Sequence, residues 1–306
     1  MFCKKTVADI TYLSYNNTCL EVFFMKKLLC FLVSLLIITS VLPFSALADG
    51  NTLTVIAFGD SITAADKWQK HIEKEYGIDI INAGVGGDTT NNAKARFKRD
   101  VLNRKPDIVF ISLGVNDCAI DMSRYVDLET YKANMAYFIE ECEKIGAKVI
   151  VNIPTPVVDE QYLTRHEKEP FKPYGGPNGI VTVYADACRE VAMEKGVVFA
   201  DLNAYFKGLD GGYAKYFPDG VHPNDTGYKM YAEVAMAAYQ SLWLGDVNFD
   251  RSIDRYDYIL VKRVCMKTVT LDEKQLLSAD VNKNGKTDTY DYILIKRHCM
   301  KTFVIA

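Results

Sequence analysis

The sequence lacks the features that indicate a nucleic-acid-binding protein or a disulfide-stabilised fold. Its formal net charge is −3 and it has no basic stripe with interleaved aromatic residues, so we expect no nucleic-acid partner. Of its eight cysteines, three lie within the first 30 residues, and the other five include no Cys-x-x-Cys pair. This odd number of remaining cysteines, with no such pair, argues against a disulfide framework. Cys142 and Cys188 fall on apolar helix faces, where we expect buried thiols.

The N-terminal region carries a predicted secretory signal peptide at residues 25–48. Met25 and two lysines open a short basic segment, residues 28–42 are almost wholly apolar, and residues 46–48 form a small-x-small cleavage site. The apolar run is too short for a stable membrane span. We therefore expect residues 1–24 to be an upstream extension and Met25 to be the true start. The mature protein would begin near residue 49, outside the cell and with no membrane partner.

The rest of the chain is typical of a globular protein with an alternating α/β fold. The 306 residues are 49% hydrophobic and 25% charged, an ordinary globular composition. Strand-like and helix-like patterns alternate from residue 53 to 244, which predicts a parallel sheet covered by helices on both faces. The expected strands are 53–58, 78–82, 107–113, 148–153 and 197–201, and the expected helices are 65–76, 89–103, 128–145, 181–195 and 226–242.

One segment, residues 154–179, interrupts this alternation. It contains five prolines and three glycines and has no clear period. Because it leaves the carboxyl end of an expected strand, it should overhang the edge where ligands bind in open α/β sheets. We expect a loop that lines a substrate site, with a disordered surface loop as the alternative.

Four short polar motifs stand at strand ends or just before the last helix. Gly-Asp-Ser-Ile-Thr at 59–63 follows the first expected strand, and Asn-Ala-Gly-Val-Gly-Gly-Asp-Thr at 82–89 follows the second. Gly-Val-Asn-Asp at 114–117 follows the third, and Asp-Gly-Val-His-Pro at 219–223 precedes the last helix. A doubly wound sheet can bring all four motifs to one edge.

The residue types in these motifs suit acyl transfer. Ser61 is a poor nucleophile until a base takes its proton, and His222 can act as that base near neutral pH. Asp219 can accept the other imidazole N–H and stabilise the imidazolium. The backbone N–H groups of Ser61 and Gly87 and the side-chain amide of Asn116 would form an oxyanion hole.

These residues and their order resemble the SGNH (GDSL-type) hydrolase family over about 190 residues. The resemblance implies Ser61 as nucleophile, Asp219 and His222 as its partners, and Ser61, Gly87 and Asn116 as the oxyanion hole. It favours Gly87 over Gly84, because Gly-Asp-Thr is the family's usual continuation. It also implies a flavodoxin-like three-layer α/β/α sandwich with a five-stranded parallel sheet, and no cofactor at the catalytic site.

A strong internal repeat follows residue 244. Residues 246–267 and 280–301 align without gaps and are identical at 14 of 22 positions. Each copy starts with a 12-residue loop, 246–257 or 280–291, with oxygen-bearing side chains at positions 1, 3, 5, 9 and 12 and a backbone carbonyl at position 7. Such loops suit Ca²⁺. The predicted ligands are Asp246, Asn248, Asp250, Ser252, Asp254 and Asp257 in the first loop, and Asp280, Asn282, Asn284, Lys286, Asp288 and Asp291 in the second.

This duplicated half EF-hand resembles a type I-like dockerin, a small all-α module. The resemblance implies two Ca²⁺ ions and binding to a cohesin of a scaffold protein, in either of two orientations. Two departures are Arg251 at position 6, where glycine is usual, and aspartate instead of glutamate at position 12. The implied cohesin contacts are Arg255, Tyr256, Lys262 and Arg263 in the first copy, and Thr289, Tyr290, Lys296 and Arg297 in the second.

Together these features predict an SGNH hydrolase domain at 49–244 and a dockerin at 245–306. The predicted function is a secreted serine esterase, attached to a bacterial cellulosome-like complex, that removes acetyl groups from plant cell-wall polysaccharide such as xylan. One alternative is a lysophospholipase- or thioesterase-like acyl hydrolase, which would need a long apolar groove. The other is a non-catalytic carbohydrate-binding module on the same fold, which the intact set of polar residues disfavours.

Overall fold

The computed structural model describes residues 53–303, apart from residue 251, and residue 305. The predicted signal peptide and the extension before it lie outside these residues, and so does Arg251 in the first repeated loop. Within the described part, no helix is both long enough and apolar enough to cross a membrane.

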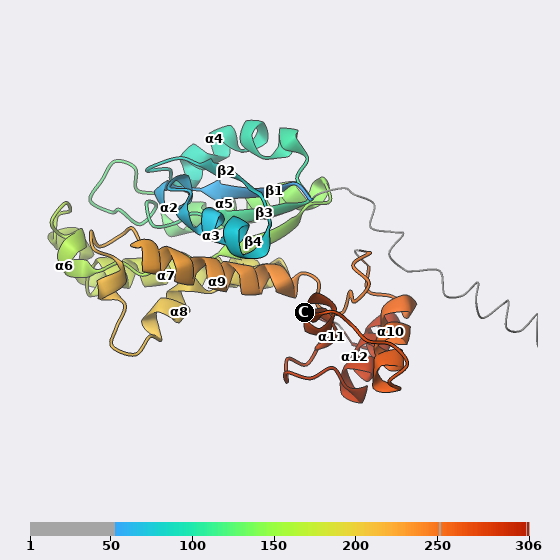
Figure 1. Cartoon of the computed structure of the whole chain (residues 1–306). Helices are drawn as coiled ribbons and strands as arrows, with labels where there is room; N and C mark the ends of the chain where they lie inside the picture. The colour runs from blue at the N-terminus through green and yellow to red at the C-terminus, as the bar shows by residue number, and fades with distance from the viewer. Residues whose placement is uncertain (1–52, 251, 304, 306) are drawn as a thin grey trace, which may run out of the picture. The chain divides into compact units, whose positions relative to one another are not determined.

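Five parallel strands form one sheet in the order β2-β1-β3-β4-β5, with helices on both sides (Figure 1). This confirms the predicted fold, and every strand lies within two residues of its expected bounds. Gly59 at the end of β1 pairs with Gly84 of β2 and Ser112 of β3, so these three strands end level with one another. The strands are Val55–Gly59 (β1), Ile80–Gly84 (β2), Ile108–Ser112 (β3), Lys148–Asn152 (β4) and Val198–Ala200 (β5).

Alternate residues of each strand pack into two separate hydrophobic cores, one on each face of the sheet. In β1, Ile56 and Phe58 face one core, whereas Val55 and Ala57 face the other. This follows from the two-residue period of a strand. Helices α4 (Thr90–Asp100), α5 (Leu128–Lys144) and α7 (Pro177–Glu194) cover the first face; α3 (Lys67–Tyr76), α8 (Leu202–Lys207) and α9 (Asp225–Ser241) cover the second.

The expected helix at 65–76 is α3 (Lys67–Tyr76) in the structure, and a separate short helix that was not expected precedes it. The four-residue helix α2 (Ser61–Ala64) directly follows β1, and α3 begins at Lys67. Between them Asp66 adopts a left-handed conformation with φ of 58°, which a continuous helix does not allow. The break turns the chain so that α2 stays at the edge of the sheet while α3 packs along its face.

Residues 154–179 are more regular than expected. Two short elements, α6 (Asp159–Tyr162) and η3 (Glu169–Tyr174), lie within the segment. Helix α7 begins at Pro177, four residues before the expected start, because proline at the first helical position loses no intrahelical hydrogen bond. The remaining 3₁₀ turns are η2 (Leu102–Arg104) and η4 (Ala214–Tyr216).

The two copies of the C-terminal repeat form helices α10 (Arg255–Cys265) and α12 (Thr289–Cys299), and α11 (Glu273–Ala279) lies between them. Helices α10 and α12 begin with the same capping box, in which an aspartate at position 9 of the loop caps the helix and one at position 12 reaches back. The region has a small core of its own, made by Val247, Val261, Ala279, Val281, Leu294 and Ile295. All five cysteines of the described part are free thiols, and Cys142 and Cys188 are buried as predicted.

Candidate functional sites

The structure brings Ser61, His222 and Asp219 into one hydrogen-bonded chain. Ser61 is the first residue of α2, and its Oγ lies 2.8 Å from Nε2 of His222. The other ring nitrogen, Nδ1, lies 2.6 Å from Oδ2 of Asp219. When Nδ1–H donates to Asp219, Nε2 accepts a hydrogen bond from the serine hydroxyl. This is the tautomer in which the imidazole can take the serine proton.

The turn that carries His222 is held by the carboxylate of Asp219. Its Oδ1 accepts hydrogen bonds from the backbone N–H of Val221 (2.9 Å) and of His222 (2.7 Å). Burial alone would raise the pKa of Asp219, but its hydrogen bonds from His222 and Val221 outweigh this effect and lower the pKa to about 2. Asp219 is therefore ionised at neutral pH. The Asp219 and His222 side chains are 40% and 41% exposed, so this end of the chain is open to solvent.

The three expected oxyanion donors follow three adjacent strands that end at the same level. Ser61 lies just beyond β1, Gly87 beyond β2 and Asn116 beyond β3. Nδ2 of Asn116 donates to the carbonyl oxygen of Asp88, the residue after Gly87 (3.0 Å). One amide hydrogen thus fixes the side chain, and the second is available to a ligand.

The structure also separates the two candidate glycines of this loop. Gly84 is the last residue of β2, and a Cβ there would lie 2.3 Å from the backbone nitrogen of Ala64 in α2. Gly87 lies in the loop with φ of 78°, a conformation that favours glycine. Gly84 therefore allows close packing of α2, whereas Gly87 occupies the exposed turn at the strand ends.

Asp60, directly before the candidate nucleophile, is almost fully buried. Its Oδ1 caps α2 by accepting a hydrogen bond from the N–H of Ile62 (3.0 Å). Burial raises the pKa of Asp60 to about 7, and this hydrogen bond only partly opposes the rise. The carboxyl group of Asp60, next to the candidate nucleophile in the chain, thus changes charge near neutral pH.

Two residues of the 154–179 segment contact the turn that carries Asp219. The N–H of Val158 donates to the carbonyl oxygen of Gly220 (2.9 Å). Nη2 of Arg165 donates to the carbonyl oxygen of Asp219 (2.8 Å). These contacts brace the turn from the outside, a role that composition alone did not indicate.

A second His–Asp pair, which the sequence did not reveal, links this segment to the loop after β3. Nδ1 of His166 lies 2.9 Å from Oδ1 of Asp121, and the imidazole stacks on Tyr162 with ring centroids 3.9 Å apart. His166 has no aspartate three residues before it, so local spacing gave no signal for this pair. Because both side chains are at most 5% exposed, we read the pair as a link between two loops.

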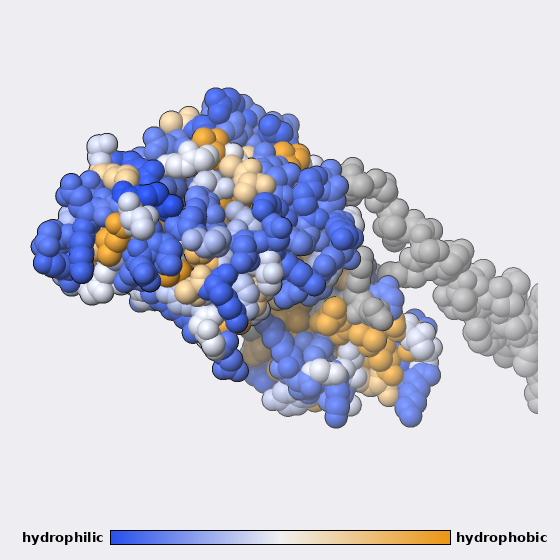
Figure 2. Space-filling model, turned by 60° about the vertical axis from the view of Figure 1, so that its left-hand side comes forward, coloured by the Kyte–Doolittle hydropathy of each residue, from blue (hydrophilic) through white to orange (hydrophobic). Residues whose placement is uncertain are grey.

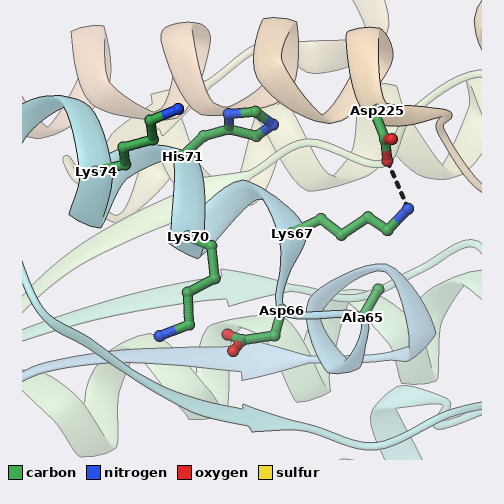
Figure 3. A pocket seen from close by; sticks show the side chains of 7 residues that line it. All are labelled: Ala65, Asp66, Lys67, Lys70, His71, Lys74 and Asp225. Carbon is green, nitrogen blue, oxygen red and sulfur yellow. Dashed lines mark hydrogen bonds and ion pairs between the residues drawn. The ribbon is translucent and has the colours of Figure 1, made fainter.

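An open groove of about 460 Å³ lies between α3 and the start of α9 (Figure 3). Its charges are largely compensated: Lys67 pairs with Asp225 (2.6 Å) and Lys70 with Glu73 (2.5 Å). None of the candidate catalytic residues lines it. The lining residues are Ala65, Asp66, Lys67, Lys70, His71, Lys74 and Asp225.

The two repeated loops present oxygen atoms of the kind that suit Ca²⁺. The N–H of Asp250 donates to oxygens of Asp246 (3.2 Å) and Asn248 (2.9 Å). The second loop repeats this pattern, since the N–H of Asn284 donates to oxygens at positions 1 and 3 of its own loop. Asp257 and Asp291, at position 12, are fully buried at the loop ends. Among the described residues no three His, Cys, Asp or Glu side chains form a ready-made metal cluster, so a bound Ca²⁺ would also need the asparagine and backbone oxygens.

All eight residues that the dockerin resemblance implies as cohesin contacts are exposed. Hydrophobic atoms gather on the surface of this region (Figure 2). The exposed apolar side chains repeat in the two copies: Tyr256, Ile259 and Met266 in the first copy match Tyr290, Ile293 and Met300 in the second, with exposures between 41% and 62%. The isoleucines and methionines were not among the predicted contacts, although each lies about one helical turn along the chain from residues that were.

Fold and site together define a class: a three-layer α/β protein with a Ser–His–Asp chain at the carboxyl edge of a parallel sheet. The chain belongs to the GDSL-like lipase/acylhydrolase family, whose sequence model matches residues 57–230. A type I dockerin domain matches residues 244–299. The predicted order of an SGNH hydrolase followed by a dockerin is therefore confirmed.

Three known proteins illustrate the similarity. An uncharacterised lipoprotein, YqeF, of Bacillus subtilis is 35% identical over 181 residues, which cover 52% of this chain and 74% of that protein. An acetylxylan esterase of Geobacillus stearothermophilus is 25% identical over 181 residues, with coverage of 56% and 76%. The crystal structure of a lipase/acylhydrolase from Enterococcus faecalis superposes with a TM-score of 0.51 at 24% identity, covering 60% of this chain and 94% of that one; this likeness concerns the fold.

Proposed function

We propose that the protein is a secreted serine esterase that removes acetyl groups from plant cell-wall polysaccharide such as xylan. The observation that carries the proposal is the chain from Ser61 Oγ through His222 to Asp219, with contacts of 2.8 and 2.6 Å. It supplies a nucleophile, a base and an orienting carboxylate in hydrogen-bonding contact.

In the proposed mechanism His222 takes the proton of Ser61 as Oγ attacks the carbonyl carbon of the ester. Asp219 stabilises the resulting imidazolium. The negative oxygen of the tetrahedral intermediate accepts hydrogen bonds from the N–H groups of Ser61 and Gly87 and from the amide of Asn116. His222 then returns the proton to the departing sugar oxygen, which leaves an acyl-serine.

Water then hydrolyses the acyl-enzyme, with His222 again acting first as the base and then as the acid. His222 removes a proton from water, the hydroxide attacks the acyl carbon, and Ser61 leaves with the proton that His222 returns. The products are acetate and the free sugar hydroxyl.

Two features support polysaccharide as the substrate. The catalytic region is similar to an acetylxylan esterase, and the dockerin implies attachment to a cohesin of a scaffold protein. We propose that the hydrolase domain ends at residue 244 and the dockerin begins at residue 245. Both dockerin loops would hold Ca²⁺ through the predicted ligands. The protein would act outside the cell on a cellulosome-like complex. Oxygen donors at alternate loop positions favour Ca²⁺ over softer metals.

The test is acetate release from acetylated xylan, acetylated mannan and acetylated pectin by the full chain and by Ser61→Ala. We expect release from xylan that Ser61→Ala abolishes. Hydrolysis of p-nitrophenyl esters of two and twelve carbons sets the acyl preference, with the short ester expected to react faster. Faster cleavage of the long ester would indicate a lysophospholipase-like enzyme, and activity unchanged in Ser61→Ala would contradict the mechanism.

A further inference from the structure

One buried arginine, Arg96 of α4, contacts the backbone of both the first and the second motif. Its Nη2 donates to the carbonyl oxygen of Gly59 (2.9 Å) and its Nη1 to that of Ala83 (2.7 Å). Its Nε donates to Oδ2 of Asp88 (2.6 Å). The guanidinium group therefore joins the end of β1 to β2 and to Asp88 in the loop that follows β2.

Each of these contacts leads to one of the oxyanion donors. Gly59 lies two residues before Ser61, and Ala83 and Asp88 bracket Gly87. The backbone carbonyl of Asp88 accepts the amide hydrogen of Asn116. The third donor, from the loop after β3, is thus fixed to the same residue whose carboxylate binds the arginine.

We infer that Arg96 is a positioning residue of the oxyanion hole, holding all three donors in one geometry through Gly59, Ala83 and Asp88. It reaches substrate only through these residues. The inference rests on the proposed serine-esterase function and names what organises that site.

The chemistry of the side chain suits this role. Guanidinium is planar and presents five N–H donors in a rigid fork, whereas lysine offers one compact ammonium group. The guanidinium group itself is held in place. The Arg96 side chain is 9% exposed, Asp100 accepts from Nη1 (3.1 Å), and the ring centroid of Phe58 lies 4.4 Å from the guanidinium carbon. Because oxyanion stabilisation depends on donors placed before the reaction, small shifts of these loops reduce the rate of the chemical step.

The test compares Arg96→Lys with Arg99→Lys, a matched variant on the same helix. Arg99 also pairs with Asp100, but its side chain is 74% exposed. With p-nitrophenyl acetate we expect Arg96→Lys to lower kcat by about 10- to 100-fold with KM within about twofold, because displaced donors weaken only the transition state. The inhibition constant of an alkyl boronic acid, which forms a tetrahedral adduct on Ser61, should rise by a similar factor. Arg99→Lys should match the wild type in all three quantities.

If Arg96→Lys does not fold at the assay temperature, a second variant, Asp88→Asn, tests the positioning role of Arg96. Asp88→Asn keeps the backbone carbonyl that Asn116 binds but weakens the contact to the guanidinium, and it should show the same fall in kcat with unchanged KM. The inference is overturned if folded variants keep kcat within threefold of the wild type, if KM rises instead, or if boronate affinity stays constant while kcat falls. A wild-type protein that neither cleaves the ester nor binds the boronate would refute the proposed function, and this inference with it.

Discussion

Replacing Asp219 by asparagine tests the direction of proton transfer along the Ser–His–Asp chain. Oδ1 of Asp219 accepts two backbone N–H groups, from Val221 and His222. Asparagine can satisfy both only with its own oxygen, which leaves its NH₂ group facing Nδ1 of His222. The ring then holds its proton on Nε2, the nitrogen that faces Ser61, and this tautomer cannot act as the base.

The expected loss of kcat in Asp219→Asn follows from two free-energy costs at His222. Returning to the reactive tautomer leaves a ring N–H facing an NH₂ group, an unsatisfied donor that costs about 1–3 kcal/mol. The imidazolium also loses a hydrogen bond to a charged partner, worth about 1.5–3 kcal/mol. At about 1.4 kcal/mol per tenfold change the sum corresponds to roughly 10²- to 10⁴-fold. Because Asp219 is 40% exposed, solvent screening favours the lower part of this range, and we expect a loss of about 10²- to 10³-fold.

The assay is kcat for p-nitrophenyl acetate at pH 7.5, with a thermal melt of each variant to show that it is folded. Asp225→Asn is the matched control, since Asp225 lies three residues beyond His222, is 83% exposed and pairs with Lys67. We expect it to stay within twofold of the wild type. A folded Asp219→Asn enzyme that retains more than a fifth of wild-type kcat would refute the reasoning.

Three further predictions concern other parts of the molecule. Asn116→Ala should lower kcat by about 10²- to 10³-fold with little change in KM, because one oxyanion donor is lost. Asp60 has a folded pKa of about 7 against 3.8 for the free group, so the folded state binds more protons between these values and its stability falls as pH rises through that window. Asp60→Asn should remove this loss and raise the free energy of unfolding at pH 8, by at most about 4 kcal/mol at 1.36 kcal/mol per pKa unit, with urea melts at pH 4.5 and 8 as the measurement. Chelation of Ca²⁺ should abolish cohesin binding, measured by calorimetry, and leave ester hydrolysis unchanged.

Each of these predictions has an outcome that contradicts it. A loss below tenfold in Asn116→Ala would remove that amide from the oxyanion hole. For Asp60→Asn, a fall in stability between pH 4.5 and 8 equal to that of the wild type would show that Asp60 titrates normally. Part of the fall in stability with pH should remain in Asp60→Asn, because burial also raises the pKa of Asp117, to about 6. Loss of hydrolysis together with cohesin binding would mean that the two modules do not fold independently.

The strands and the polar motifs were predictable because their signals are local. Residues 55–58 and 108–111 are continuous apolar runs, typical of buried parallel strands, and the motifs follow such runs directly. The short helix α8 was missed, since its six residues are too few to show a helical period. The start of α7 was also misplaced, because Pro177 follows two glycines and this combination usually indicates a turn.

The contacts that organise the candidate site were out of reach of such reasoning. Arg96 meets Gly59 across 37 positions of sequence, and His166 meets Asp121 across 45. Nothing in the local pattern distinguishes Arg96 from Arg99, three residues later, although one is buried and the other exposed. Only the packing of α4 against the sheet decides which arginine points inward.

The solvent exposure of His222 bears on the fate of the acyl-serine. A base with about two-fifths of its side chain in water can recruit a water molecule without waiting for a lid to open. Under the proposed function, the departing sugar and other alcohols that diffuse to the same nitrogen must compete with bulk solvent. For the proposed esterase, such an open arrangement favours hydrolysis of the acyl-enzyme over transfer of the acyl group between sugars.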